Sequence, residues 1–183
     1  MLNIDDLIAN FFQCFKNNEG ELYNEFSLQH ELGIFLRQQL PSYKIQFERN
    51  VSFFNITKTI KKEIDIVIYN DTERYAIELK YPLNGQYPEQ MYSFVRDIKF
   101  MEELKENGFT QTYAICLIRD KLFYEGKNTD GIYSFFRDEF VISGIIHKPT
   151  GNLKGKDFIK INGCYKIQWI NCLSYHKYYL IKI

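Results

Sequence analysis

The chain contains few of the residues that mark disordered, fibrous or disulfide-linked proteins. Its 183 residues include 10 glycines, 4 prolines and 4 cysteines. Such low glycine and proline contents exclude fibrous and low-complexity chains. Basic and acidic residues are equal in number, at 23 each, which argues against a protein that is coated by nucleic acid over its whole surface.

The cysteines form no C-x-x-C pair, the spacing that is typical of redox and zinc sites. Cys14 and Cys116 lie inside apolar runs, where we expect reduced, buried thiols. A zinc site from the other two cysteines and two histidines is conceivable, although the spacing fits no common zinc pattern. These residues are His147, Cys164, Cys172 and His176.

Long apolar segments are also missing. No run approaches the ~20 apolar residues that span a bilayer, and Asp5 and Asp6 interrupt the first apolar stretch, where a signal peptide would need an unbroken one. We therefore expect a cytoplasmic protein with no membrane partner. The chain does contain 45% apolar and 17% aromatic residues, which is typical of a globular protein and predicts one domain over residues 1–183.

Charge is unevenly distributed along the chain. Residues 1–31 hold six acidic side chains and one basic residue, Lys16, whereas residues 147–183 hold seven lysines and one acidic residue, Asp157. A basic C-terminal segment of this kind could neutralise phosphate groups. It is equally typical of a solvated surface formed by β-hairpins.

Hydrophobic periodicity predicts an alternation of helices and strands. The expected helices cover 4–17, 24–40, 88–108 and, as a short one, 130–140; the expected strands cover 43–54, 62–69, 74–81, 111–119, 157–161, 164–170 and 175–183. Asn162-Gly163 is expected to be the turn of a C-terminal hairpin. The order over about 24–120 is α-β-β-β-α-β, which predicts an α/β fold with a mixed central sheet flanked by helices, and about 145–183 form a β-rich extension.

The central pair of strands brings two acidic residues together. If 70–73 form the turn, Asp65 lies opposite Glu78 and Glu63 lies opposite Lys80. Opposed residues have Cβ atoms about 5 Å apart, so two carboxylates would meet there. A divalent cation such as Mg²⁺ or Mn²⁺ relieves this repulsion. The Leu79 carbonyl would be within reach as a further ligand, and Lys80 returns to the same face.

The same residues have a plainer interpretation. Glu63 and Lys80 could form a cross-strand ion pair at a solvated sheet end, with Asp65 and Glu78 exposed beside it. The three-residue pattern E-x-K is weak by itself, because a second copy, Glu103-Leu104-Lys105, falls in the predicted long helix. The setting between predicted helices favours the cation site.

The run Glu63-Ile64-Asp65-Ile66-Val67-Ile68, a turn, and then Ala76-Ile77-Glu78-Leu79-Lys80 resembles the PD-(D/E)xK nuclease superfamily of restriction-endonuclease-like folds. The resemblance covers about 24–120 and implies an αβββαβ core. It implies that Asp65 and Glu78 hold the metal and that Lys80 lies beside the attacking water. Many members add a glutamate from the first core helix, for which Glu31 is the candidate and Glu25 the weaker choice.

Two positions depart from the family pattern. Ile64 replaces the proline, which is a common variation. The exonuclease-like branch carries Q-x-x-x-Y, but here Gln90 is followed by Phe94, so Gln90 is only a further possible site residue.

The resemblance implies a Mg²⁺- or Mn²⁺-dependent nuclease that hydrolyses DNA phosphodiester bonds, in restriction or other DNA processing. Lys80 would orient or deprotonate the water, or stabilise negative charge in the transition state. RNA remains open as a substrate, and a homodimer would suit double-strand cutting. Two other functions stay open: a nuclease-like module that binds nucleic acid or a protein without cutting, and an assembly protein that uses its aromatic surface.

Overall fold

A mixed β-sheet lies at the centre of the molecule. The computed structural model describes residues 2–17, 22–138, 140–173 and 175–183, and in this part six strands form the sheet in the order β1-β2-β3-β4-β8-β7. The sheet strands are β1 (Lys44–Asn50), β2 (Glu63–Tyr69), β3 (Arg74–Lys80), β4 (Gln111–Ile118), β7 (Ile170–Asn171) and β8 (Lys177–Lys182). All neighbouring strands are antiparallel except β3 and β4, which run parallel.

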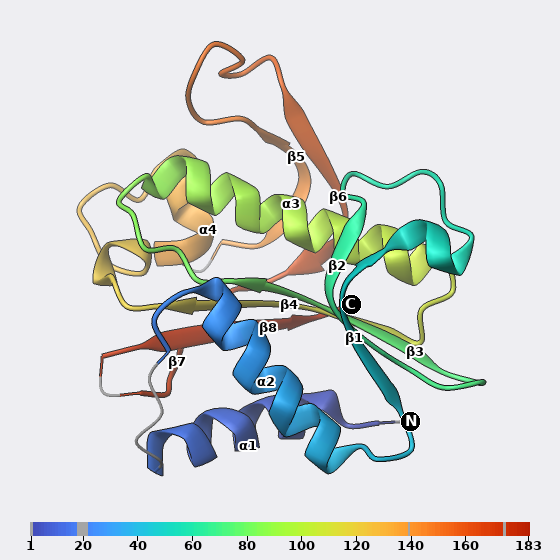
Figure 1. Cartoon of the computed structure of the whole chain (residues 1–183). Helices are drawn as coiled ribbons and strands as arrows, with labels where there is room; N and C mark the ends of the chain where they lie inside the picture. Colours follow the sequence, from blue (N-terminus) through green and yellow to red (C-terminus); the bar gives the residue numbers. More distant parts are fainter. Residues whose placement is uncertain (1, 18–21, 139, 174) are drawn as a thin grey trace.

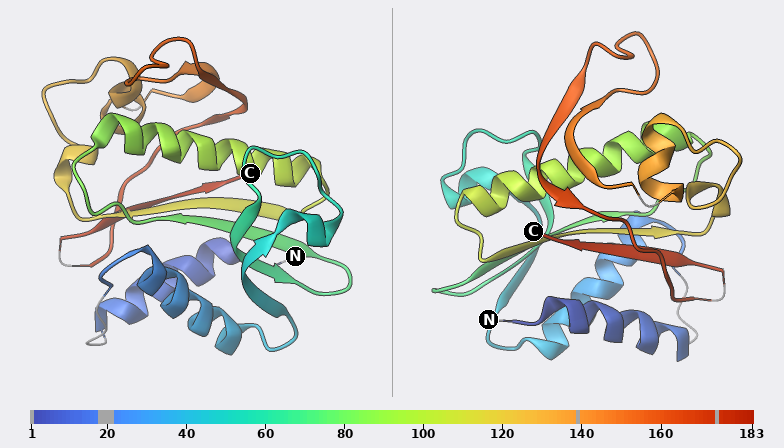
Figure 2. Two further views of the ribbon diagram at one scale, coloured as in Figure 1. Left: turned by 45° about the horizontal axis from the view of Figure 1, so that its top comes forward. Right: turned by 180° about the vertical axis from the view of Figure 1, so that it is seen from behind.

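Helices cover both faces of this sheet. On one face lie α1 (Ile4–Asn17) and α2 (Glu25–Gln39), and on the other lies α3 (Tyr87–Glu106), which connects β3 to β4 (Figures 1 and 2). The order α2-β1-β2-β3-α3-β4 is the predicted one. The chain therefore has an α/β fold with a mixed sheet flanked by helices, as expected.

The alternation of side chains along the strands divides the core into two layers. On β3, Ala76 packs on the α3 side, whereas Tyr75 and Ile77 pack on the side of α1 and α2. β4 is buried on both faces, so its sequence Gln111–Ile118 reads as a nearly unbroken apolar run. The sheet is thus a rigid platform, and polar groups can gather only where its strands end.

Helix α2 begins with a strong capping arrangement. The side chain of Asn24 accepts a hydrogen bond from Ser27 N at 2.8 Å, and the Ser27 hydroxyl in turn accepts from Asn24 N at 3.0 Å. Glu25 follows in the first turn, where the helix dipole favours a negative charge. Further along, Gly33 lies against the Phe47 ring, and a Cβ atom there would collide with it. This glycine lets α2 pack closely onto β1.

The C-terminal region corrects one prediction. Asn162-Gly163 is not a hairpin turn, because it lies inside β6 (Phe158–Tyr165), which pairs with β5 (Ile142–His147) and shifts its register at this point. The buried carboxylate of Glu102 on α3 accepts hydrogen bonds from Asn162 N at 2.9 Å and Gly163 N at 2.6 Å. The two backbone amides therefore find their acceptor on a distant helix, and not in the tight turn that Asn-Gly favours locally.

Other element boundaries differ less. The expected strand over 43–54 stops at Asn50, whose side chain caps a short 3₁₀ helix, η1 (Val51–Phe54), by accepting from Ser52 N at 3.0 Å. The expected helix over 130–140 is reduced to the short helices η3 (Gly131–Tyr133) and α4 (Ser134–Arg137). A third short helix, η2 (Lys121–Phe123), follows β4. In the described residues, every helix is too short or too polar to cross a membrane.

The ribbon formed by β5 and β6 rises above α3, away from the central sheet (Figure 1). Four lysines of the basic C-terminal segment lie on or beside this ribbon: Lys148, Lys154, Lys156 and Lys160. The expected β-rich extension is therefore partly a separate two-stranded ribbon, while β8 joins the central sheet next to β4.

Candidate functional site at the edge of the central sheet

The two strands β2 and β3 separate at the predicted acidic pair. They pair from Tyr69–Arg74 to Ile66–Ile77, which is the predicted register. One step further, Asp65 Oδ2 accepts the backbone N–H of Leu79 at 2.7 Å, and Asp65 N lies 3.4 Å from Glu78 Oε1. Each acidic side chain thus binds the backbone of the opposite strand, and both lie where the hairpin opens.

Lys80 lies at the end of β3 among acidic groups from three elements. Its ammonium group is 2.9 Å from the Leu79 carbonyl, 3.3 Å from Glu25 Oε1 on α2 and 3.6 Å from Asp97 Oδ2 on α3. The other oxygen of Glu25 accepts from Tyr81 N at 3.0 Å. The simple Glu63–Lys80 ion pair is not formed among the described residues, because the strands have already separated.

A second lysine lies on the buried acidic groups. Lys61 comes from the loop before β2, and its ammonium group bridges Glu78 Oε2 and Asp97 Oδ1, the latter at 3.0 Å. Glu78 is 1% exposed and Asp97 is 4% exposed, so both carboxylates need a cation nearby. We call the six charged residues that meet here the acid–lysine cluster. They are Glu25, Lys61, Asp65, Glu78, Lys80 and Asp97.

The acid–lysine cluster faces an open cleft of about 550 Å³. Lys61, Asp65, Lys80 and Asp97 line its inner part, and Arg96 on α3 adds a further cation to its wall. Four carboxylates share two ammonium groups in the cluster, so an additional divalent cation would balance its charge. The cleft gives such a cation, or a phosphate group, access from solvent.

The surroundings of Asp65 and Lys80 change the acidity of both groups. Burial raises the pKa of Asp65 to about 6, although Lys61, Lys80 and the Leu79 N–H partly oppose this. Burial alone would lower the pKa of Lys80, but Asp97, Glu25 and Asp65 together raise it above its ordinary value. Lys80 is therefore a protonated cation at neutral pH, while Asp65 changes its charge within reach of physiological pH.

Glu31 is not part of the cluster, which corrects the prediction for the first core helix. Its side chain is 43% exposed and lies 3.7 Å from His30 Nδ1. Gln29, two residues earlier, points toward the sheet and donates to the Asp65 carbonyl at 2.8 Å. Two residues along a helix correspond to about 200°, so Glu31 faces away from the site. Glu25, the weaker choice, supplies the carboxylate.

Gln90 also lies apart from the cluster. Its amide donates to Asn84 at 3.1 Å on the protein surface, and Phe94 is buried in the core. Asp97, two turns further along α3, takes part instead. The sequence did carry a signal for this residue: Asp97 lies three positions after Phe94 and four before Met101, on the buried side of the helix. An acidic residue at such a position needs a partner.

The carboxylate and carbonyl oxygens of the cluster suit a hard divalent cation, but in this arrangement they contact ammonium groups. Glu78 binds Lys61, and the Leu79 carbonyl binds Lys80. In the described ranges, no group of three or more His, Cys, Asp or Glu side chains is close enough to hold a metal ion. This finding also applies to the zinc site considered above for His147, Cys164, Cys172 and His176. Asp97 Oδ2 is buried and accepts no hydrogen bond among the described residues. Movement of Lys61 would also free Asp97 Oδ1 and Glu78 Oε2 as oxygen ligands.

A comparison with protein-family models, with curated proteins and with solved structures finds no match to this chain.

Proposed function

We propose that the chain is a Mg²⁺- or Mn²⁺-dependent nuclease that hydrolyses DNA phosphodiester bonds, with a restriction-endonuclease-like core over about 24–120. One observation supports this most: Asp65 and Lys80 line one open cleft at the point where two strands separate, and Glu78 is buried directly behind them, beside the backbone of Asp65. Such a concentration of buried charge is costly for stability, and perturbed groups of this kind gather at functional sites.

Two further features agree with a phosphate-containing substrate. The α2-β1-β2-β3-α3-β4 order, with α2 and α3 on opposite faces, is the αβββαβ arrangement that the resemblance implies. Basic side chains also surround the cleft: Lys62 and Arg96 line it, and Arg96 also lines a neighbouring pocket with Lys148 of the β5–β6 ribbon. Cations around an acidic centre can hold the phosphates that flank a scissile bond.

The ligands of the metal would be the carboxylates of Asp65 and Glu78 and the carbonyl of Leu79, with Glu25 or Asp97 in the place predicted for Glu31. When bound, a divalent cation would act as a Lewis acid on the phosphodiester and activate a water molecule. Lys61 must leave Glu78 to admit it, and its flexible side chain, 24% exposed, can turn toward solvent. A divalent cation would thus take the place of the Lys61 ammonium group on Glu78.

The charge of Lys80 narrows its role. Its raised pKa keeps it protonated, so it cannot accept a proton from water in this arrangement. It can donate hydrogen bonds to a phosphate oxygen and stabilise the negative charge that develops on it. Glu25 and Asp97 hold the ammonium group in place from the two sides of the sheet. Of the roles expected for this lysine, the protonated form favours charge stabilisation and orientation of the water over deprotonation.

Nicking of supercoiled plasmid DNA in Mg²⁺ or Mn²⁺ tests the proposal. We expect cleavage by the unmodified protein and none by Asp65→Ala or Lys80→Ala, with metal binding mostly intact in Lys80→Ala. Lys105→Ala is a matched control, because it removes the lysine of the second E-x-K pattern, whose ammonium group contacts the Thr110 carbonyl. Full activity in Lys80→Ala would remove the lysine from the mechanism, and the absence of divalent-dependent cleavage in the unmodified protein would contradict the enzyme proposal.

One observation favours a second candidate, a module that binds nucleic acid without cutting. The Lys61 ammonium group already bridges Glu78 and Asp97, so each of these buried carboxylates has a cationic partner without a metal. DNA binding that needs no divalent cation, together with no cleavage by either the unmodified protein or Lys61→Ala, would support this alternative.

A further inference from the structure

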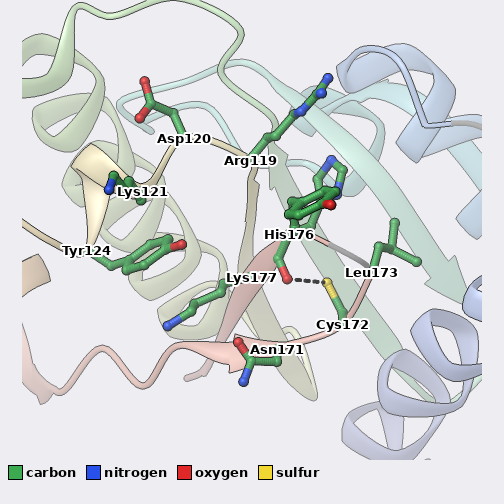
Figure 3. Close-up of a pocket in the computed structure, with 10 residues that line it drawn as sticks. Arg119, Asp120, Lys121, Tyr124, Asn171, Cys172, Leu173, His176 and Lys177 are labelled. Carbon is green, nitrogen blue, oxygen red and sulfur yellow. Dashed lines mark hydrogen bonds between the residues drawn. The ribbon is translucent and has the colours of Figure 1, made fainter.

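A second pocket opens at the same edge of the sheet as the cleft, two strands further along. It has a volume of about 590 Å³ and lies between the segment after β4 and the start of β8 (Figure 3). The ends of β3 and β4 lie together because these strands are parallel, and Ile118 at the end of β4 pairs with Lys177 at the start of β8. None of the residues in the acid–lysine cluster lines this pocket.

Cations dominate the charged groups that line this pocket. Arg119 and Lys121 come from the segment after β4, and Lys177 comes from β8 (Figure 3). The acidic residue in the lining, Asp120, already has hydrogen-bond donors: its carboxylate accepts from Tyr87 Oη at 2.5 Å and from Leu122 N at 3.0 Å. The three cations outnumber this carboxylate, so the charged side chains that line the pocket have a net positive charge and attract anions.

Aromatic rings accompany these cations. The Lys177 ammonium group lies 4.1 Å from the centre of the Tyr124 ring, which holds it at the pocket wall. Tyr175 is 78% exposed, an unusual position for a large aromatic side chain. Cations that track a phosphate backbone, together with exposed rings on which bases stack, are the combination that binds unpaired nucleic-acid strands.

The pocket is also linked to the cleft through a contact between two side chains. His176 in its lining lies 2.8 Å through Nε2 from the hydroxyl of Tyr81, which directly follows Lys80. Strand β4 alone lies between β3 and β8, so the ends of β3 and β8 that face the two sites are about 10 Å apart. At about 3.4 Å per nucleotide of a stacked strand, this corresponds to about three phosphates.

We propose that this pocket binds the phosphates and an unpaired base of a nucleic-acid strand that continues from the cleft along the sheet edge. The inference rests on the proposed function, since it takes the strand in the pocket to be the one whose phosphodiester lies in the cleft. Arg119, Lys121 and Lys177 hold the backbone, and Tyr175 stacks on the base. Because of this pocket, we expect strands with an unpaired segment to be better substrates than blunt duplexes.

Binding of fluorescein-labelled oligonucleotides, measured by fluorescence anisotropy in EDTA, tests this proposal separately from cleavage. We expect Arg119→Glu and Lys121→Glu each to weaken binding of a single strand about tenfold and to reduce the salt dependence of binding. Lys44→Glu is the matched control, because Lys44 is exposed at the opposite end of the sheet. Tyr175→Ala should weaken binding of the single strand about tenfold but leave a blunt duplex unchanged. Unfolding midpoints in urea establish that each variant folds.

The outcomes separate the two proposals. Loss of binding in the pocket variants supports the pocket, even where no cleavage is found in any metal. Unchanged affinity and salt dependence in Arg119→Glu and Lys121→Glu overturn the pocket, whether or not the protein cleaves DNA. Competition by inorganic phosphate shows whether the pocket binds a nucleic-acid strand or a small anion. Displacement of the oligonucleotide only at millimolar phosphate supports the strand, whereas displacement at micromolar phosphate overturns the proposal.

Discussion

Replacement of Asp65 by asparagine should make the metal-free protein more stable, even though it removes a proposed catalytic group. Asparagine resembles the protonated carboxyl group and can still accept the hydrogen bond from Leu79 N, which is 2.7 Å long in the unmodified protein. It does not carry the negative charge that burial disfavours. The expected gain follows from the pKa of Asp65, which is raised from 3.8 to about 6 chiefly by burial.

The sign and the size of the effect follow from proton linkage. The folded protein holds this proton more tightly than the unfolded chain, so the free energy of unfolding falls as the pH rises from about 4 to about 6 and is level above that. A pKa change from 3.8 to about 6 corresponds to at most about 3 kcal/mol. Because Asp65 is partly exposed to water, we expect about 2 kcal/mol. Asp65→Asn should therefore be about 2 kcal/mol more stable than the unmodified protein at pH 8 and no more stable at pH 4.

Urea unfolding in EDTA, followed by the fluorescence of the single tryptophan, Trp169, measures this difference across the pH range. Asp71→Asn, in the exposed turn between β2 and β3, is the matched control, and its difference in stability from the unmodified protein should be the same at every pH. Mn²⁺ should stabilise the unmodified protein more than Asp65→Asn, because a bound cation offsets the charge of the carboxylate. A gain in stability that is the same at pH 4 and pH 8, or a loss of stability at pH 8, would refute the reasoning.

Three further predictions concern other buried charges. Lys61→Ala should lower the free energy of unfolding by roughly 3 kcal/mol, since it leaves the buried carboxylate of Glu78 without its ammonium partner and Asp97 with Lys80 alone. The variant should also bind Mn²⁺ more tightly in calorimetry, and unchanged stability would show that the bridge is unimportant. Glu25→Gln should reduce plasmid nicking about tenfold or more, because Lys80 is then no longer held in place. Glu31→Gln on the same helix should nick as fast as the unmodified protein, and equal losses in the two variants would show that Glu31 takes part in the site. Glu102→Gln should lower the free energy of unfolding, measured in urea, by about 2 kcal/mol, because one of the carboxylate oxygens that bind the β6 backbone becomes an amide donor. A smaller effect than that of Glu106→Gln would contradict this role of Glu102.

Local patterns in the sequence were enough to predict the centre of the candidate site. The alternation along β2 and β3 and the turn over 70–73 determine the register, and the register places Asp65 beside Glu78. Lys80 follows two residues later on the same strand. These relations depend on neighbours within one hairpin, where side chains alternate with a period of two and a shift of one residue would exchange the faces. The helix and strand order around the hairpin was predictable for the same reason.

Only the tertiary structure decided which residues complete the cluster. Lys61, Asp97 and Glu25 come from a loop and two helices on opposite faces of the sheet, and their meeting depends on how those elements pack. Helical periodicity cannot choose between Glu25 and Glu31 until the face of α2 that touches the sheet is known. The Asn162-Gly163 pair also depended on the tertiary structure. Its local preference for a turn was overridden because Glu102, some 60 residues earlier in the chain, binds both amides where β6 shifts its register against β5. Short-range rules determine what each segment prefers, whereas burial forces each charged group to find a partner wherever in the chain that partner lies.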